Sequence, residues 1–247
     1  MSDKKTEKNR YNSEAQSALD NNNLSSVNNL TLPLKTPYFF YQKAITNRAN
    51  SDSLILEIGA GMGENTEFLL ATEAKVYATD ISQDSLNVMK KRFVTDRLIT
   101  KIADIEKLPF EDGVFDMVVN AGSLSYGDHN TVLNEIYRVL KPAGAFIAID
   151  SLNHNPIYRF NRYVHYLRGS RSLSVIKRAP DLRLLRKYEG KFGQAENQFF
   201  GSISYLVPLL NAVFGEKITT KISDRIDSLV GVKRSAFKFV MVAEKKI

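Results

Sequence analysis

Three closely spaced glycines follow an apolar run and could form a loop around a nucleotide-like cofactor. They lie in the stretch LILEIGAGMGENT (residues 54–66), at Gly59, Gly61 and Gly63. A dinucleotide fingerprint has the spacing Gly-x-Gly-x-x-Gly, and here Glu64 occupies the place of its third glycine. A glutamate at a helix start would repel a pyrophosphate, and Glu57 at the strand end also favours a cationic group. The loop therefore predicts a cofactor without a diphosphate.

Two acidic residues follow the next strand-like runs and complete a pattern for binding adenosine. Asp80, with Ile81 after it, comes about 20 residues beyond the glycine loop, where a carboxylate can accept hydrogen bonds from both ribose hydroxyls. Asp104 stands between Ala103 and Ile105, so an acid can hold the adenine amine while an apolar neighbour covers the ring. The pattern fits an adenosine cofactor of any kind.

The elements that must position these residues alternate in type. Short strand-like runs cover 54–58, 75–79, 98–102, 115–119 and 145–150, and helix-like stretches lie near 64–71, 83–94 and 129–140. Such alternation is typical of βαβ units, in which ligands bind at the carboxyl ends of the strands. We therefore predict an α/β fold with a Rossmann-like, mostly parallel seven-stranded sheet, helices on both faces and a helical cap inserted after the fifth strand.

The flanking segments suggest four regions. Residues 1–35 are either a flexible N-terminal segment or a lid over a ligand, and Thr36-Pro37 is expected to begin a helix that runs to about Ala49. Residues 36–150 form the predicted cofactor-binding core and residues 151–191 the basic helical cap. Residues 192–247 complete the sheet with strands near 196–200 and 236–244, separated by a partly helical insertion.

The cap is predicted to begin with an amphipathic helix. Asn155-Pro156 has the pattern of an N-cap followed by a first-turn proline, and Gly169 is expected to end the helix. Its apolar face would carry Ile157, Phe160, Val164 and Leu167, and its polar face Arg159, Arg162, Tyr163 and Tyr166. The polar face could bind a phosphate and stack on a ring or sugar, or it could simply be solvated.

Composition and charge limit the classes of partner. The chain has 247 residues, a net charge of +7 and no cysteine, which excludes disulfides and thiolate metal sites and suits a cytoplasmic location. Residues 151–191 hold ten Lys/Arg and two acids, so the positive charge is local and indicates a site for an anionic partner. No apolar run is long enough to predict a membrane span, and no metal site is expected.

In their order and spacing the core motifs resemble those of the class I S-adenosylmethionine-dependent methyltransferases of the small-molecule type. The resembling stretches are EIGAGMG (57–63), TDIS (79–82), ADIEKLPFEDGVFDMVV (103–119) and RVLKPAGAFIAID (138–150), where Ala143 departs from a common second glycine. The resemblance implies S-adenosyl-L-methionine as cofactor. Its implied contacts are Glu57, Gly59, Ala60 and Gly61 for the methionine part, Asp80 and Ile81 for the ribose, Ala103, Asp104 and Ile105 for adenine, and Asn120, Ala121 and Gly122 on the methyl-donor side.

The remainder of the chain bears a softer resemblance to methyltransferases of bacterial surface-polysaccharide and lipopolysaccharide synthesis. It rests on DSLNHNPIYRFNRYVHYLRGSRS (150–172), FFGSISYLVPLL (199–210) and RSAFKFVMVAEKK (234–246). The acceptor that this implies is a small anionic or phosphorylated sugar, methylated at a hydroxyl or amine. It could be a nucleotide sugar or a growing or lipid-linked glycan.

Methyl transfer requires an acceptor lone pair in line with the S–CH3 bond, and a hydroxyl acceptor benefits from a base. The candidate groups follow the fourth and fifth strands or lie on the cap: His154, Tyr126, Asp128 and His165. His154 can titrate near neutrality but could equally be a loop histidine without a chemical role. Asp128 is also expected to cap the helix that His129 opens.

Two other functions stay open at this stage. The basic cap could present RNA to the cofactor, although the patch is short and no separate RNA-binding module is evident, so nucleic acid is not the expected partner. The chain could also be a cofactor-binding subunit without catalysis. The sequence does not indicate an oligomeric state.

Overall fold

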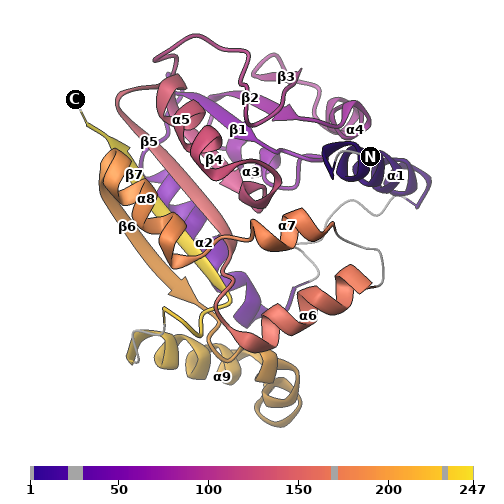
Figure 1. Ribbon diagram of the computed structural model, residues 1–247, viewed down its shortest axis with the longest axis vertical. Helices are drawn as coiled ribbons and strands as arrows, with labels where there is room; N and C mark the ends of the chain where they lie inside the picture. Colours follow the sequence, from indigo (N-terminus) through magenta and orange to yellow (C-terminus); the bar gives the residue numbers. More distant parts are fainter. Residues whose placement is uncertain (1–2, 22–29, 168–171, 230–232, 247) are drawn as a thin grey trace.

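The computed structural model describes residues 3–21, 30–167, 172–229 and 233–246, and its centre is a twisted sheet (Figure 1). Within these residues seven strands pair in the order β3-β2-β1-β4-β5-β7-β6. The strands are β1 (Leu54–Ile58), β2 (Lys75–Asp80), β3 (Leu98–Ile102), β4 (Phe115–Ala121), β5 (Leu140–Ser151), β6 (Gly193–Phe200) and β7 (Lys238–Lys245). The first five run parallel, and β7 pairs antiparallel with both β5 and β6. The predicted seven-stranded α/β sheet is confirmed.

Apolar side chains on both faces of the sheet make it the core of the molecule. One face packs against α5 (His129–Val139) and α8 (Leu182–Phe192), with Ile136, Tyr188 and Phe192 fully buried there. The other packs against α2 (Leu32–Thr46), α3 (Thr66–Leu70) and α4 (Gln83–Arg92). Because parallel strands buried on both faces are mostly apolar, the runs at 54–58 and 115–119 are hydrophobic except for Glu57 and Asp116.

The helix near residue 36 begins earlier than the sequence indicated. α2 starts at Leu32, with Thr31 at its N-cap and Pro33 in its first turn, so Pro37 lies inside the helix. The expectation that Thr36-Pro37 opens the helix was therefore wrong. Pro33 and Pro37 lie four residues apart. Pro33 occupies the first turn of α2, where the N–H that proline lacks would have no hydrogen-bond partner within the helix.

The segment between β5 and β6 is helical, as are parts of the segment between β6 and β7. The first contains α6 (Pro156–Leu167), α7 (Leu173–Lys177) and α8, and Asn155 caps α6 by accepting a hydrogen bond from the Ile157 N–H at 2.9 Å. The second contains η2 (Ser204–Leu206) and α9 (Val207–Leu229), which is kinked at Gly215. Gly169, the expected end of α6, lies outside the described residues. No described helix combines the length and the apolarity needed to cross a bilayer.

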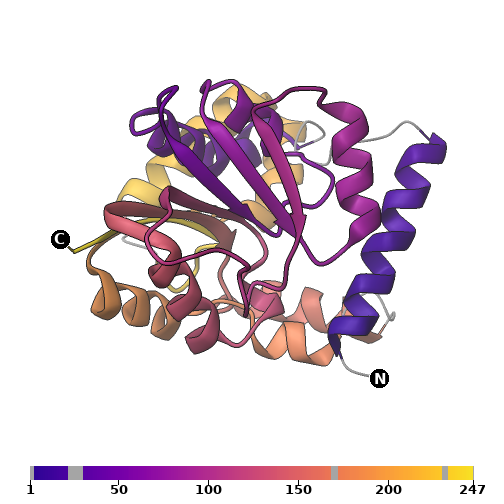
Figure 2. The same cartoon turned by 90° about the horizontal axis from the view of Figure 1, so that it is seen from above.

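The N-terminal helix α1 (Asp3–Asn21) lies beside α4, near the carboxyl ends of β1, β2 and β3 (Figures 1 and 2). It is a polar helix whose few inward contacts are specific: Asn12 accepts a hydrogen bond from the Ser82 hydroxyl at 2.6 Å, and Ala15 is fully buried. Part of the segment expected to be a flexible tail or a lid is therefore an ordered helix against the core.

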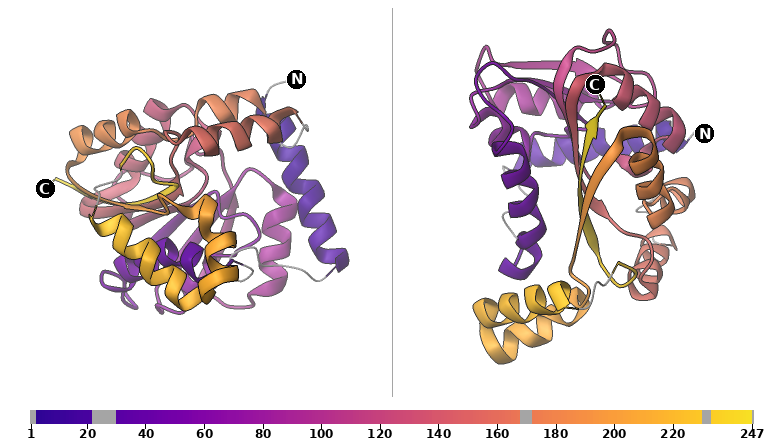
Figure 3. Two further views of the ribbon diagram at one scale, coloured as in Figure 1. Left: turned by 90° about the horizontal axis from the view of Figure 1, so that it is seen from below. Right: turned by 90° about the vertical axis from the view of Figure 1, so that its left-hand side faces the viewer.

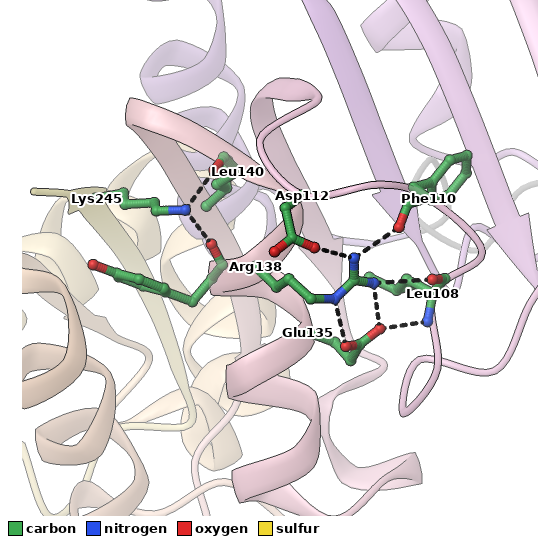
Figure 4. Close-up of polar contacts among 8 residues, drawn as sticks. Leu108, Phe110, Asp112, Glu135, Arg138, Leu140 and Lys245 are labelled. Atoms are coloured by element: carbon green, nitrogen blue, oxygen red, sulfur yellow. Dashed lines mark hydrogen bonds and ion pairs between the residues drawn. The ribbon is translucent and has the colours of Figure 1, made fainter. Parts of the chain in front are cut away.

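A network around Arg138 of α5 fixes the loop that leads from β3 to β4 (Figure 4). Its guanidinium donates to the carbonyls of Leu108 and Phe110 at 3.0 and 2.7 Å and pairs with Glu135 and Asp112. Glu135 in turn accepts from the Leu108 N–H at 2.7 Å. Because this loop begins with the predicted adenine-binding residues, the network also holds their backbone in place.

Candidate active site

A cavity lies at the carboxyl ends of β1 to β4, at the place where ligands of open α/β sheets bind. It has about 780 Å³ of empty space, a value that includes its opening to solvent. The residues that line it come from these strand ends, from α1 and from α7: Lys4, Glu7, Tyr11, Gly59, Gly61, Asp80, Ile81, Ala103, Asp104, Ile105, Ala121, Gly122, Ser123, Tyr126, Ser174, Val175 and Arg178.

The glycine loop brings backbone to the edge of the cavity. Gly59 and Gly61 have φ values of +64° and +57°, a left-handed conformation that glycine adopts without strain. A Cβ on Gly59 would overlap the side chain of Ser123, so β1 and β4 end too close together for any larger residue. Ala60 is buried beside them, and its N–H donates to the carbonyl of Thr79 at 2.9 Å.

Asp80 joins the glycine loop to the end of β2. One carboxylate oxygen accepts from the Gly61 N–H at 2.9 Å and the other from the Ser82 N–H at 2.8 Å. Burial raises the pKa of Asp80, and these backbone hydrogen bonds oppose the rise. The side chain lies in the cavity wall with Ile81, so its remaining lone pairs can accept from ribose hydroxyls.

Glu57 lies beneath the cavity rather than in its wall. Its carboxylate is almost fully buried and accepts a hydrogen bond from the Thr66 hydroxyl at 2.5 Å. Burial raises the pKa of Glu57 to about 8, with the Thr66 hydrogen bond acting in the opposite direction and the charges of Glu64 and Asp80 adding to the rise. A cation above this site would favour the charged form.

The loop after β3 contributes Ala103, Asp104 and Ile105 to the cavity wall, as the sequence predicts. One Asp104 oxygen accepts from the Glu106 N–H at 3.0 Å, and the other pairs with Lys4 of α1 at 2.5 Å. Lys4 also pairs with Glu106, so α1 is attached to the loop where an adenine amine would bind. An adenine would therefore have to share Asp104 with Lys4 or displace it.

The end of β4 forms the opposite side of the cavity. Ala121 and Gly122 line it, whereas Asn120 is fully buried below them and donates to the Ile58 carbonyl and to Ser123. The Asn120 Oδ1 atom has no hydrogen-bond partner among the described residues. Asn120 thus supports the backbone of the cavity wall and does not itself line it.

Of the three catalytic candidates whose side chains the structure describes, Tyr126 is the one that lines the cavity. It lies in η1 (Leu124–Tyr126), and its hydroxyl accepts from the Tyr11 hydroxyl at 2.7 Å and from Arg10 at 3.2 Å. Asp128 is exposed and caps α5, accepting from the Thr131 N–H at 3.0 Å, so the predicted capping role is confirmed. Its predicted catalytic role has no support from this position.

Of the two histidine candidates, His154 has a described side chain and His165 does not. His154 does not line the cavity, and its Nε2 atom accepts from the Leu182 N–H at 2.9 Å at the start of α8. That bond uses the lone pair that a base would need, so the geometry favours a structural role for His154. His165 lies on α6, and its side chain is outside the described part of the structure.

The predicted substrate-binding face of α6 is not part of the cavity wall. Arg159 and Tyr163 are exposed, Tyr163 and Tyr166 lie with ring centroids 5.9 Å apart, and Arg162 donates to Asn153 at 2.8 Å. α6 packs against α7, which supplies Ser174, Val175 and Arg178 to the wall. The basic segment therefore reaches the cavity through α7.

Seven lining residues were not among the predicted site residues: Lys4, Glu7, Tyr11, Ser123, Ser174, Val175 and Arg178. Those of α1 could not be found from periodicity, because this polar helix has no apolar stripe to show which face turns inward. Arg178 did belong to the excess of basic residues at 151–191, but charge alone does not show which arginine reaches the site.

Comparisons with known proteins agree with this geometry. The model of a methyltransferase domain matches residues 56–148. The ubiquinone/menaquinone biosynthesis C-methyltransferase UbiE of Desulfotalea psychrophila is 32% identical over 114 residues, which are 44% of this chain and 46% of that protein. The matches span less than half the length of the first curated relatives.

Solved structures extend the likeness to most of the chain. Phosphoethanolamine N-methyltransferase 2 of Haemonchus contortus, in complex with S-adenosyl-L-methionine, has a TM-score of 0.60 at 19% identity and covers 85% of this chain and 53% of that chain. Geranyl diphosphate C-methyltransferase from Streptomyces coelicolor, in complex with S-adenosyl-L-homocysteine, has a TM-score of 0.58 at 16% identity, covering 87% and 80%. The chain therefore has the α/β fold of these methyltransferase structures, and its residues 56–148 match the model of a methyltransferase domain.

Proposed function

We propose that the chain transfers the methyl group of S-adenosylmethionine to a sugar hydroxyl or amine on a small anionic acceptor, either a nucleotide sugar or a surface-glycan precursor. The observation that carries the transfer reaction is the shared cavity. Gly59, Gly61, Asp80 and Asp104 supply the cofactor side, and Tyr126 and Arg178 lie in the same wall. A cofactor and an acceptor can therefore meet within one enclosure.

An anionic acceptor is supported by the basic segment that reaches the cavity. Residues 151–180 contain six Lys/Arg and no acid, and Arg178 of this segment lines the cavity without a salt bridge among the described residues. The names of two structural neighbours denote phosphorylated substrates, geranyl diphosphate and phosphoethanolamine. The choice of a sugar rests only on the likeness of residues 150–172, 199–210 and 234–246 to surface-polysaccharide methyltransferases.

Within this proposal each residue of the site has a limited role. The cofactor supplies an activated methyl group when it is bound. Asp80 and the backbone of Gly61 hold its position, and α1 covers the cavity and excludes water. Tyr126 is the candidate to orient a hydroxyl acceptor, because its hydroxyl lies in the cavity wall and, while accepting hydrogen bonds from Arg10 and Tyr11, can donate its own proton to an acceptor oxygen.

Mass spectrometry of nucleotide-sugar pools, with and without the protein and isotope-labelled S-adenosylmethionine, tests the acceptor class. We expect one sugar species to gain a labelled methyl group. Label in a lipid, quinone or RNA fraction, with none in any sugar, would contradict the sugar acceptor and leave the transfer reaction intact. RNA binding that weakens about 1000-fold or more between low and moderate salt would favour an RNA substrate.

Arg178→Ala tests the anionic acceptor site. The variant should raise the acceptor's KM by about 10-fold or more, since a charge-assisted contact contributes about 1.5–3 kcal/mol. Affinity for S-adenosylhomocysteine should stay within about two-fold. Arg183→Ala, an exposed arginine of α8 outside the cavity wall, is the matched control and should change neither value. An unchanged KM in Arg178→Ala would remove this arginine from the acceptor site.

A further inference from the structure

α6 carries an apolar stripe that none of the described residues covers. Ile157, Phe160 and Leu167 are 48%, 70% and 66% exposed, and Tyr163 beside them is 50% exposed. These positions repeat at helical spacing, so they form one continuous face. The opposite side holds the helix to the core through the buried Tyr158, which contacts Ser204 of η2.

The first half of α9 adds further apolar side chains at the same end of the molecule. Leu209, Val213 and Phe214 are 63%, 64% and 48% exposed. Figure 1 and the right-hand view of Figure 3 both place α6 and α9 at the end of the molecule where β5 terminates, on opposite sides of the sheet. Single exposed apolar residues are normal, but several on each of two helices indicate that this end of the molecule binds a partner.

Charge selects the kind of partner. No acid occurs between Asp150 and Asp181. Arg159 lies next to the apolar stripe, one helical turn before Tyr163. In a symmetric dimer formed through α6, the basic flank of one copy would face that of the other and repel it. A helix with phenylalanine and leucine on one side and arginine beside them has the composition of helices that lie in the plane of an anionic lipid surface.

We propose that α6, with the first half of α9, docks this protein onto an anionic lipid bilayer. Phe160 and Leu167 enter the boundary between head groups and acyl chains, and Arg159 pairs with lipid phosphates. α7 packs against α6 and lines the cavity, so the docked bilayer lies beside the active-site entrance. A lipid-linked acceptor would then reach the cofactor from the membrane; this consequence rests on the proposed function, but the docking does not.

Co-sedimentation with vesicles tests the docking without any acceptor. The purified chain should bind vesicles of phosphatidylcholine with about 30% phosphatidylglycerol at least about 10-fold more tightly than vesicles of phosphatidylcholine alone. Phe160→Ser combined with Leu167→Ser should weaken binding to the anionic vesicles about 10-fold or more, because two buried apolar side chains are lost. Arg159→Ala should weaken it about five-fold, the effect of one basic residue at the surface.

Val94→Ser is the control, because Val94 is 94% exposed but follows α4, away from α6; this variant should bind vesicles like the parent chain. Retained affinity for S-adenosylhomocysteine shows that each variant is folded. The proposal is overturned if anionic vesicles are not bound, or if the double variant binds them as tightly as the parent. It is also overturned if sedimentation velocity shows a dimer that the double variant dissociates, which would assign the stripe to a second copy. Vesicle binding without methyl transfer would contradict only the proposed function.

Discussion

Asp80 organises the cofactor site because both of its oxygens are engaged with backbone N–H groups of neighbouring loops. Asp80→Ala should lower the affinity for S-adenosylhomocysteine by about 2–4 kcal/mol, since it removes charge-assisted hydrogen bonds to the ribose and loosens the loop at Gly61. Isothermal titration calorimetry measures the change. Asp96→Ala, at an exposed turn, serves as control. Equal affinities in the two variants would show that the ribose binds elsewhere.

A comparison of Gly59 with Gly113 measures how much a side chain at position 59 of the cofactor loop lowers the free energy of unfolding. Both have left-handed φ values, +64° and +66°, but a Cβ on Gly59 would overlap Ser123, whereas none of the surrounding atoms lies within 4 Å of a Cβ on Gly113. Gly113→Ala should lower the free energy of unfolding by about 1–2 kcal/mol, the cost of the backbone conformation alone. Gly59→Ala should cost more in urea unfolding. Similar values would contradict the close approach of β1 and β4.

Glu57 should make the ligand-free protein less stable as the pH rises. Its pKa is about 8 in the fold against 4.5 as the ordinary value, so the folded protein keeps a proton that the unfolded chain has lost. Stability must then fall between about pH 5 and pH 8, by up to about 1.4 kcal/mol per pH unit. Glu57→Gln keeps an acceptor for Thr66 and should flatten this dependence in urea unfolding. Parallel pH profiles for the two proteins would contradict the raised pKa.

At the residue scale, the sequence predicted the side chains at strand ends and missed those brought in by helices. Asp80, Asp104 and Gly122 follow strands at characteristic spacing, so their positions depend on local order along the chain. Glu57 and Asn120 were also singled out, but they lie within β1 and β4, before the strand ends, and are buried below the cavity wall. Tyr11 and Arg178 reach the site only through tertiary packing.

At the scale of elements, α1 and η1 are joined by a pair of tyrosines over the cavity. The Tyr11 and Tyr126 hydroxyls lie 2.7 Å apart, and the rings meet edge to face with centroids separated by 5.8 Å. Burial raises the pKa of Tyr11, so its hydroxyl remains a donor at all ordinary pH values. The contact therefore tethers the helix that covers the cofactor.

A double-mutant cycle with Tyr11→Phe and Tyr126→Phe measures this tether. The coupling energy in unfolding should be about 0.5–1.5 kcal/mol, the net value of one hydrogen bond. Both single variants should also release S-adenosylhomocysteine faster in stopped-flow experiments, because α1 opens more readily. Additive effects on stability, with an unchanged release rate, would mean that α1 is not a lid.

The sequence predicted the strands and their alternation with helices. It predicted less well where helices begin and which helix faces are exposed. Runs such as LILEI are apolar except for Glu57 because both faces of the sheet are covered, which makes them easy to find. The start of α2 was missed because two prolines offered two possible first turns. The apolar stripe of α6 was predicted, but periodicity cannot show whether a stripe faces the core or the exterior.

At the scale of the whole molecule, four strand ends, an N-terminal helix and the helices after β5 enclose one cavity. The sheet brings Gly59, Asp80, Asp104 and Gly122 together because β1 to β4 are parallel and adjacent. A cofactor with a cationic centre suits this enclosure, since Glu7 and Asp80 are buried acids in its wall. A pyrophosphate would meet the same acids and be repelled.

Isothermal titration calorimetry of the unmodified chain with S-adenosylhomocysteine and with NAD tests this account most directly. We predict saturable binding of S-adenosylhomocysteine with one site per chain and a Kd in the micromolar range or below, equivalent to about −8 kcal/mol or better. NAD should give no measurable heat of binding under the same conditions. Saturable binding of NAD, with no response to S-adenosylhomocysteine, would contradict the assignment of the cavity and every role derived from it.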